Sequence, residues 1–127
     1  MTNTKLKIAI IGCGNMGGAI ACAVAPHASV TVFDVDAAKI KALKKRARVT
    51  SATLKDAVES SSIVILAVKP QQFDELLADI SRMNIRGKLV VSIAAGIRTL
   101  YIEKRLGLRV RVVRTMPNLP AQVNQGV

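Results

Sequence analysis

Aromatic residues and long apolar runs are scarce in this sequence. Its 127 residues include no Trp, one Tyr and two Phe, although 50% of them are hydrophobic. The core must therefore be built from Val, Ile, Leu and Ala, which is typical of parallel strands covered by helices on both faces. No apolar run approaches the roughly 18 residues that a membrane span needs. The length is that of one domain, so we expect residues 1–127 to form a single domain and to have no membrane partner.

Cysteine is equally rare, with Cys13 and Cys22 as the two examples. They lie too close together to suggest a disulfide framework, and neither a CxxC pair nor a His cluster accompanies them. We therefore expect no metal site. The first residues lack the basic, apolar and small segments of a secretory signal. A reducing cytoplasm fits these features best.

Acidic residues are few. The sequence has eight Asp and Glu against 19 Lys and Arg, which gives a formal net charge of +11. Such a charge favours either nucleic-acid binding or a solvated surface that attracts an anionic cofactor. The chain has no interleaved aromatic residues and no nucleic-acid motif, so we favour the second interpretation.

Strand and helix patterns alternate along the whole chain. Apolar or β-branched runs predict strands at residues 6–11, 29–33, 48–50, 63–68, 89–93 and 110–113. Helical spacing predicts helices at residues 16–25, 37–47 and 99–106, a short one opened by Thr53, and one behind Pro70. Strands interleaved with helices imply parallel pairing. We therefore predict an α/β fold of the Rossmann type, a doubly wound parallel sheet of about six strands in the order 3-2-1-4-5-6 with helices on both faces.

Apolar side chains at helical spacing indicate which helix faces the sheet covers. For the first helix the predicted face comprises Met16, Ala19, Ile20, Ala23 and Val24. For the helix behind Pro70 it comprises Phe73, Leu76, Leu77, Ile80 and Met83.

A glycine-rich turn joins the first predicted strand directly to the first predicted helix. It consists of Gly12, Cys13, Gly14, Asn15, Met16 and Gly17. A GxGxxG pattern is specific only in this strand–turn–helix context. The first glycine permits a tight turn, the second lets the backbone approach a pyrophosphate, and the third lets the helix pack closely on the sheet. Free amides and the helix dipole then favour an anion. We predict a dinucleotide cofactor as the partner of this turn.

Two side chains near this turn have alternative interpretations. Cys13 is either a reactive thiol activated by the helix terminus or, as we favour, a small turn residue. His27 is either a catalytic base or, as we favour, a loop residue behind Pro26.

The end of the second strand carries the acidic residue that the motif requires. Asp34 stands 20 residues after Gly14, where a carboxylate binds both adenosine ribose hydroxyls and repels a 2′-phosphate. This favours NADH over NADPH. Asp36 is the alternative acidic residue, or the cap of the next helix through the amide of Ala38 or Lys39. The basic residues from Lys39 onward would favour NADPH if they faced the ribose, but we expect most of them to face solvent.

Three further segments lie where strands end on the ligand-binding edge of such a sheet. They are Ala67-Val68-Lys69-Pro70, Ser92-Ile93-Ala94-Ala95-Gly96 and Arg114-Thr115-Met116-Pro117-Asn118-Leu119-Pro120. The first two suit a backbone that approaches the nicotinamide closely. The side chain of Lys69 is as consistent with solvation as with a cofactor contact.

With these segments in place, the whole chain resembles the N-terminal half of pyrroline-5-carboxylate reductase, an enzyme of proline synthesis. The glycine turn is common to many dehydrogenases, whereas the segments at residues 91–96 and 114–121 are more specific. The resemblance implies hydride transfer from NAD(P)H to the C=N bond of a cyclic imine, which gives proline. It places Val68, Lys69, Pro70, Ala94, Ala95 and Gly96 at the nicotinamide, and Met116, Pro117 and Asn118 where nicotinamide and imine meet.

The resemblance has departures and alternatives. The family prefers NADPH, which Asp34 and Asp36 put in doubt, and Leu119 replaces a usual Thr. Its helical domain, which forms the oligomer and completes the imine pocket, is expected to be absent, so this chain alone should have little activity, and no catalytic residue is assigned. The alternatives are the cofactor domain of another reductase or of a hydroxy-acid dehydrogenase, and a non-catalytic nucleotide-sensing module.

Overall fold

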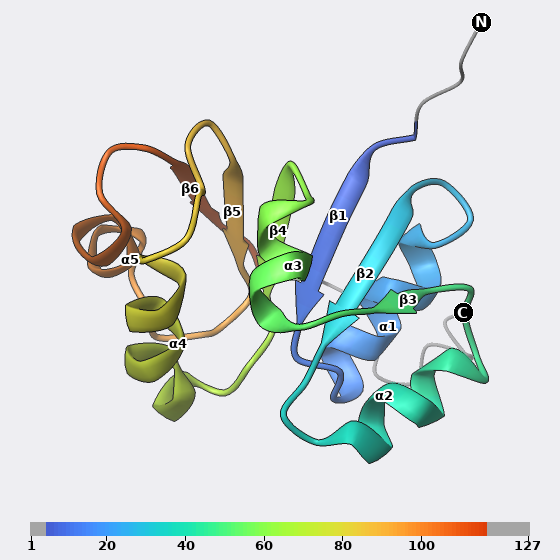
Figure 1. Cartoon of the computed structure of the whole chain (residues 1–127). Helices are drawn as coiled ribbons and strands as arrows, with labels where there is room; N and C mark the ends of the chain where they lie inside the picture. The colour runs from blue at the N-terminus through green and yellow to red at the C-terminus, as the bar shows by residue number, and fades with distance from the viewer. Residues whose placement is uncertain (1–4, 117–127) are drawn as a thin grey trace, which may run out of the picture.

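The structure, a computed structural model, describes residues 5–116 (Figure 1). One six-stranded sheet has the order β3-β2-β1-β4-β5-β6, and every neighbouring pair is parallel. This confirms the predicted doubly wound α/β fold and its strand order. The strands are β1 (Lys7–Ile11), β2 (Ser29–Phe33), β3 (Thr50–Ser51), β4 (Ile63–Leu66), β5 (Leu89–Ser92) and β6 (Arg111–Arg114). The helices are α1 (Asn15–Val24), α2 (Ala37–Lys44), α3 (Leu54–Glu59), the short η1 (Pro70–Gln72), α4 (Phe73–Ile80) and α5 (Thr99–Leu106).

Alternation along β1 divides the core into two layers. Ile8 and Ile10 lie in a cluster with the buried side chains of α1, α2 and β2. Ala9 and Ile11 lie in the other cluster, with those of α3, α4 and α5. Successive side chains of a strand point to opposite faces, so one central strand supplies both layers. Helices consequently lie on both sides of the sheet (Figure 1).

The buried face of α1 differs from the predicted one. Gly17, Gly18 and Ala21 are buried, whereas Met16 is 38% exposed. Ile20 and Val24 of the predicted face are partly buried against the core, whereas Gly17 lies nearest the turn because a Cβ there would lie 2.0 Å from the carbonyl oxygen of Gly12. The predicted stripe of α4 is confirmed, with Phe73 and its predicted partners through Ile80 buried and Met83 packed against the same core.

Local signals fix three of the helix ends. The carboxylate of Asp36 accepts a hydrogen bond from the N–H of Ala38 at 3.0 Å, which confirms it as the cap of α2. The hydroxyl of Thr53 accepts from the N–H of Asp56 at 3.1 Å and opens α3. Gly107 ends α5 with a φ of +85°. Among the described residues, no helix has both the length and the apolar character that crossing a membrane requires.

Candidate cofactor site

The glycine turn packs against the ends of β2 and β4, the two strands that flank β1. The N–H of Gly12 donates to the carbonyl oxygen of Phe33, at the end of β2, at 2.8 Å. Gly12 has a φ of +110°, and a Cβ placed there would lie 2.7 Å from the carbonyl carbon and oxygen of Ala67, just beyond β4. L side chains rarely adopt this conformation, and here backbone atoms also occupy the space. The turn therefore requires glycine at its first position.

The other two motif glycines have opposite surroundings. A Cβ on Gly17 would lie 2.0 Å from the carbonyl oxygen of Gly12, so the close approach of α1 to the turn requires glycine. A Cβ on Gly14 would meet nothing within 4 Å. Gly14 also has an ordinary φ of −75°. The protein's own packing thus explains Gly12 and Gly17, whereas the space in front of Gly14 is open.

The N-terminus of α1 opens at this turn. Gly14 is its N-cap, and no side chain within the described residues caps the helix. The first N–H groups of a helix lack intrahelical acceptors, and the helix dipole adds partial positive charge at that end. Asn15 and Met16, the first two residues of α1, are exposed. The arrangement can bind an anion such as a pyrophosphate through backbone N–H groups.

Asp34 lies beside this turn and contacts it directly. One carboxylate oxygen (Oδ2) accepts the N–H of Cys13 at 2.7 Å, and the other (Oδ1) accepts the N–H of Asp36 at 2.8 Å. The spacing in the sequence predicts a ribose contact for Asp34 but does not predict these two bonds. The strand register contains the signal, because Ile11 pairs with Phe33 and the next residues, Gly12 and Asp34, leave the sheet side by side.

Cys13 is a buried turn residue. Its side chain is 7% exposed, and its thiol donates a weak hydrogen bond to the carbonyl oxygen of Phe33 at 3.8 Å. Burial, followed by the nearby Asp34 carboxylate, raises the pKa of the Cys13 thiol from 9.0 to about 11, and Lys39 opposes this rise. A thiol with a raised pKa is a poor nucleophile at neutral pH. Burial and the raised pKa favour the interpretation of Cys13 as a small turn residue.

This raised pKa predicts a loss of stability in alkaline solution. Between pH 9 and about pH 11 the unfolded chain releases the Cys13 proton while the folded chain retains it, so unfolding becomes more favourable as the pH rises. Cys13→Ala should remove this part of the alkaline destabilisation. Thermal unfolding at a series of pH values from about 8 to 11 measures it. Parallel losses in both proteins would contradict the assignment.

The two predicted nicotinamide segments lie at the same edge of the sheet as the turn. Val68 is half-buried, whereas Lys69 and Pro70 are exposed, and the backbone N–H of Lys69 donates to Oε1 of Gln72 at 3.0 Å. After β5, Ala94 is buried and its N–H donates to Oγ of Ser92 at 3.3 Å. Ala95 and Gly96 follow and are exposed. Both segments present backbone and small side chains at the carboxyl ends of β4 and β5.

The remaining predicted residues are placed as follows. Met116 follows β6 and is 64% exposed, while Pro117 and Asn118 lie outside the described residues. His27 is exposed in the turn after α1, at the end of the helix away from Gly14, which confirms it as a loop residue. Within residues 5–116, no three His, Cys, Asp or Glu side chains are grouped so that they could hold a metal ion.

The basic residues of α2 and the loop behind it face solvent, as expected. The exposed set is Lys39, Lys41, Lys44, Lys45, Arg46 and Arg48. The three ion pairs found among the described residues join other parts of the chain. This surface therefore retains its full positive charge beside the end of β2 that carries Asp34, where an anionic ligand is attracted.

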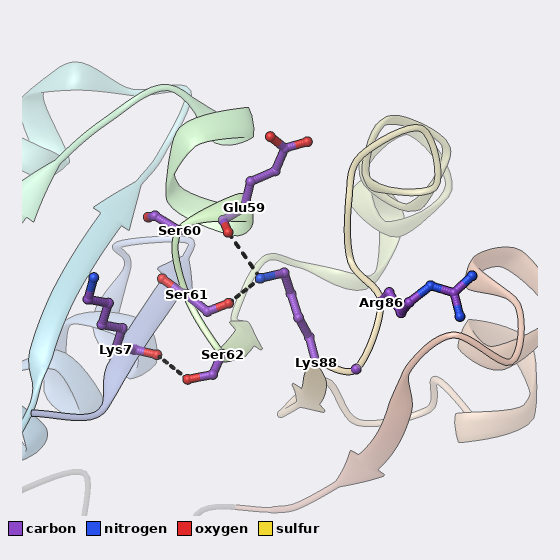
Figure 2. Close-up of a pocket in the computed structure, with 8 residues that line it drawn as sticks. Lys7, Glu59, Ser60, Ser61, Ser62, Arg86 and Lys88 are labelled. Carbon is purple, nitrogen blue, oxygen red and sulfur yellow. Dashed lines mark hydrogen bonds between the residues drawn. The ribbon is translucent and has the colours of Figure 1, made fainter. Parts of the chain in front are cut away.

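A hollow lies at the amino edge of the sheet, opposite the edge that carries the glycine turn (Figure 2). Its volume is about 290 Å³, and Lys88 crosses it to donate to the carbonyl oxygens of Glu59, at 3.1 Å, and Ser61. Burial lowers the pKa of Lys88. The side chain of Arg86 points away from Lys88 in Figure 2. These bonds close the C-terminus of α3, so we assign this hollow a structural role.

Comparison with known proteins places the chain in a family. The family model described as NADP oxidoreductase, coenzyme F420-dependent, matches residues 7–96. The chain belongs to this family. The description of this family as NADP oxidoreductases agrees with the turn and fold described above.

Individual relatives agree with the resemblance seen in the sequence. Pyrroline-5-carboxylate reductase of Pasteurella multocida is 37% identical over 129 residues, and that of Escherichia coli is 34% identical over 127 residues. Each comparison covers 95% of this chain and 47% of the relative. The structure of a pyrroline-5-carboxylate reductase from Coxiella burnetii matches with a TM-score of 0.80 and 31% identity, over 95% of this chain and 47% of that one. The chain thus spans about half the length of the relatives it matches.

Proposed function

We propose that residues 1–127 form the cofactor-binding domain of an imine reductase that converts 1-pyrroline-5-carboxylate to proline. The turn at residues 12–17 carries this proposal, because it leaves open space at Gly14 beside an uncapped helix N-terminus. The substrate is proposed from the relatives, which are named pyrroline-5-carboxylate reductases and match 95% of the chain. The free thiols of Cys13 and Cys22 suit the proposed location in the cytoplasm.

Each predicted site residue has a place in this proposal. The backbone of Gly12, Cys13, Gly14, Asn15, Met16 and Gly17 holds the pyrophosphate, and Asp34 binds the adenosine ribose. The backbones of Val68, Lys69, Pro70, Ala94, Ala95 and Gly96 border the nicotinamide. Met116, Pro117 and Asn118 border the position where imine and nicotinamide meet.

The proposed hydride transfer requires these residues mainly to position the nicotinamide and the imine. When bound, the reduced nicotinamide supplies a hydride, and a protonated imine is already electrophilic. The chain's residues therefore act by orienting the ring and by excluding water from it. Small side chains at Ala94 and Ala95 allow that close approach. No catalytic acid is assigned.

The turnover of pyrroline-5-carboxylate tests the proposed reaction. We expect a protein of the relatives' full length that contains this chain to oxidise NADH or NADPH when the imine is supplied. This chain alone should bind cofactor with little turnover, because it spans 47% of the reductases it resembles. A complete protein that cannot reduce the imine would refute the proposed substrate while leaving cofactor binding intact.

Asp34 makes NADH the preferred cofactor in this proposal. Asp34→Ser should shift the ratio of the two dissociation constants toward NADPH by about tenfold, because the carboxylate no longer repels the 2′-phosphate. Asp36→Asn is the matched control. It removes an equal charge two residues away and keeps the helix cap, so the ratio should stay nearly constant. Equal ratios in the Asp34→Ser variant and the unmodified chain would refute the preference.

A further inference from the structure

We propose that Asp34 is also a positioning residue, whose carboxylate holds the glycine turn in its binding conformation before any dinucleotide arrives. The idea rests on the proposed function, because it concerns the same cofactor site. In addition to the proposed ribose contact, the Asp34 carboxylate binds backbone N–H groups of the protein itself.

The two hydrogen bonds of Asp34 tie together three segments. Oδ2 accepts the N–H of Cys13 inside the turn, at 2.7 Å. Oδ1 accepts the N–H of Asp36, directly before α2, at 2.8 Å. Asp34 itself follows the last residue of β2. One side chain therefore joins the turn to the end of β2 and to the start of α2.

The bond to Cys13 completes the anchoring of the turn. The neighbouring N–H of Gly12 is bound by the carbonyl oxygen of Phe33 at 2.8 Å. The N–H of Cys13 is the next donor along the chain, and Cys13 is buried, so water cannot readily replace a lost acceptor. A charged acceptor at this short distance makes a stronger bond than a neutral one. Gly12 and Cys13 are thus both held by hydrogen bonds, and the next residue of the turn is Gly14, which faces open space.

The carboxylate retains capacity for the ribose. Its two oxygens offer about four acceptor positions, and the two backbone N–H groups occupy one on each oxygen. The remaining positions are available to hydroxyl donors. Asp34 therefore couples the ribose end of the site to the pyrophosphate end, since a single group contacts both.

Asparagine is the sharpest substitution for this role. Its side chain has nearly the same shape, but one of its two ends is an NH₂ donor. Whichever way the amide turns, it presents that donor to the N–H of Cys13 or to that of Asp36. Asp36→Asn is again the control, since it removes the same charge and leaves the bonds of Asp34 in place.

A cofactor without ribose hydroxyls separates the two roles of Asp34. The probe is an NADH analogue whose adenosine ribose lacks the 2′ and 3′ hydroxyls, titrated into the whole chain. We expect Asp34→Asn to weaken this analogue by about tenfold, because the turn is no longer held, whereas Asp36→Asn should change it by less than about twofold. If Asp34→Asn weakens NADH but leaves the analogue unchanged, Asp34 acts on the ribose alone and the proposal is overturned.

Amide hydrogen exchange without any cofactor provides a readout that does not depend on binding. The N–H of Cys13 should exchange faster in Asp34→Asn, while the buried Val32 in β2 should exchange at its original rate. If Asp34→Asn turns the donor toward Asp36 instead, the N–H of Asp36 should show the faster exchange and the bond to Cys13 persists. Asp34→Ala, which offers no acceptor to Cys13, then takes the place of Asp34→Asn in the titration of the analogue. Unchanged exchange at both positions would overturn the proposal. A chain that binds no dinucleotide would refute the proposed function, and the exchange rates would still test the role of Asp34.

Discussion

Gly17→Ala is expected to destabilise the fold by about 3 kcal/mol or more, the largest effect that we predict for a single methyl group in this chain. The added Cβ would lie 2.0 Å from the carbonyl oxygen of Gly12 and 3.1 Å from the Cβ of Ala67. The nearer atom is backbone, so a change of rotamer cannot relieve the contact, and α1 would have to move away from the sheet. Urea unfolding measures the free energy of unfolding of both proteins.

Gly18→Ala is the matched control for this substitution. It adds the same methyl group one residue along the same helix, where the nearest atom would be a guanidinium nitrogen of Arg46 at 3.6 Å. Alanine is favoured over glycine within a helix by about 1 kcal/mol, so this variant should be as stable as the original chain or slightly more stable. Equal destabilisation by the two substitutions would contradict the close approach of α1 described here.

Gly14→Ala is expected to leave stability unchanged and to weaken dinucleotide binding by about a hundredfold, which corresponds to about 2.8 kcal/mol. The protein tolerates the methyl group, because a Cβ at this position meets nothing within 4 Å and the φ of −75° suits any residue. The same methyl group would occupy the space through which a pyrophosphate approaches the N–H groups of α1. Thermal unfolding and a calorimetric titration with NADH measure the two quantities on the same sample.

The Gly18→Ala variant also serves as the control for Gly14→Ala. It should bind NADH as the original chain does, because Gly18 is buried within the protein and a Cβ there would meet no atom closer than 3.6 Å. If Gly14→Ala bound NADH normally, the pyrophosphate would have to lie elsewhere. If the Gly14→Ala variant unfolded instead, that result would contradict the open space that the structure shows at Gly14.

The sequence predicted those features that depend on neighbouring residues. Alternating apolar runs predicted the strand order, and the end residues of β2 were predicted without error. Asp36 and Thr53 were predicted as caps because a capping bond reaches only two or three residues along the chain.

Features that depend on tertiary contacts were missed. The face of α1 was predicted from apolar residues at helical spacing, which does not identify Gly17, whereas the close approach of α1 to the turn buries this residue. The bond from Cys13 to Asp34 spans 21 residues and follows from the register of β1 with β2. The strand pattern predicts that these two strands are neighbours, but not which residues end side by side.

The most direct test of the central claim is a calorimetric titration of this chain with NADH and with NADPH, repeated with Gly14→Ala. The account predicts saturable binding of one dinucleotide per chain, with NADH bound more tightly and the variant much weaker. The contradictory result is the absence of binding for both dinucleotides, together with a strong, salt-dependent affinity for nucleic acid. That outcome would assign the positive surface of α2, rather than the glycine turn, as the functional site.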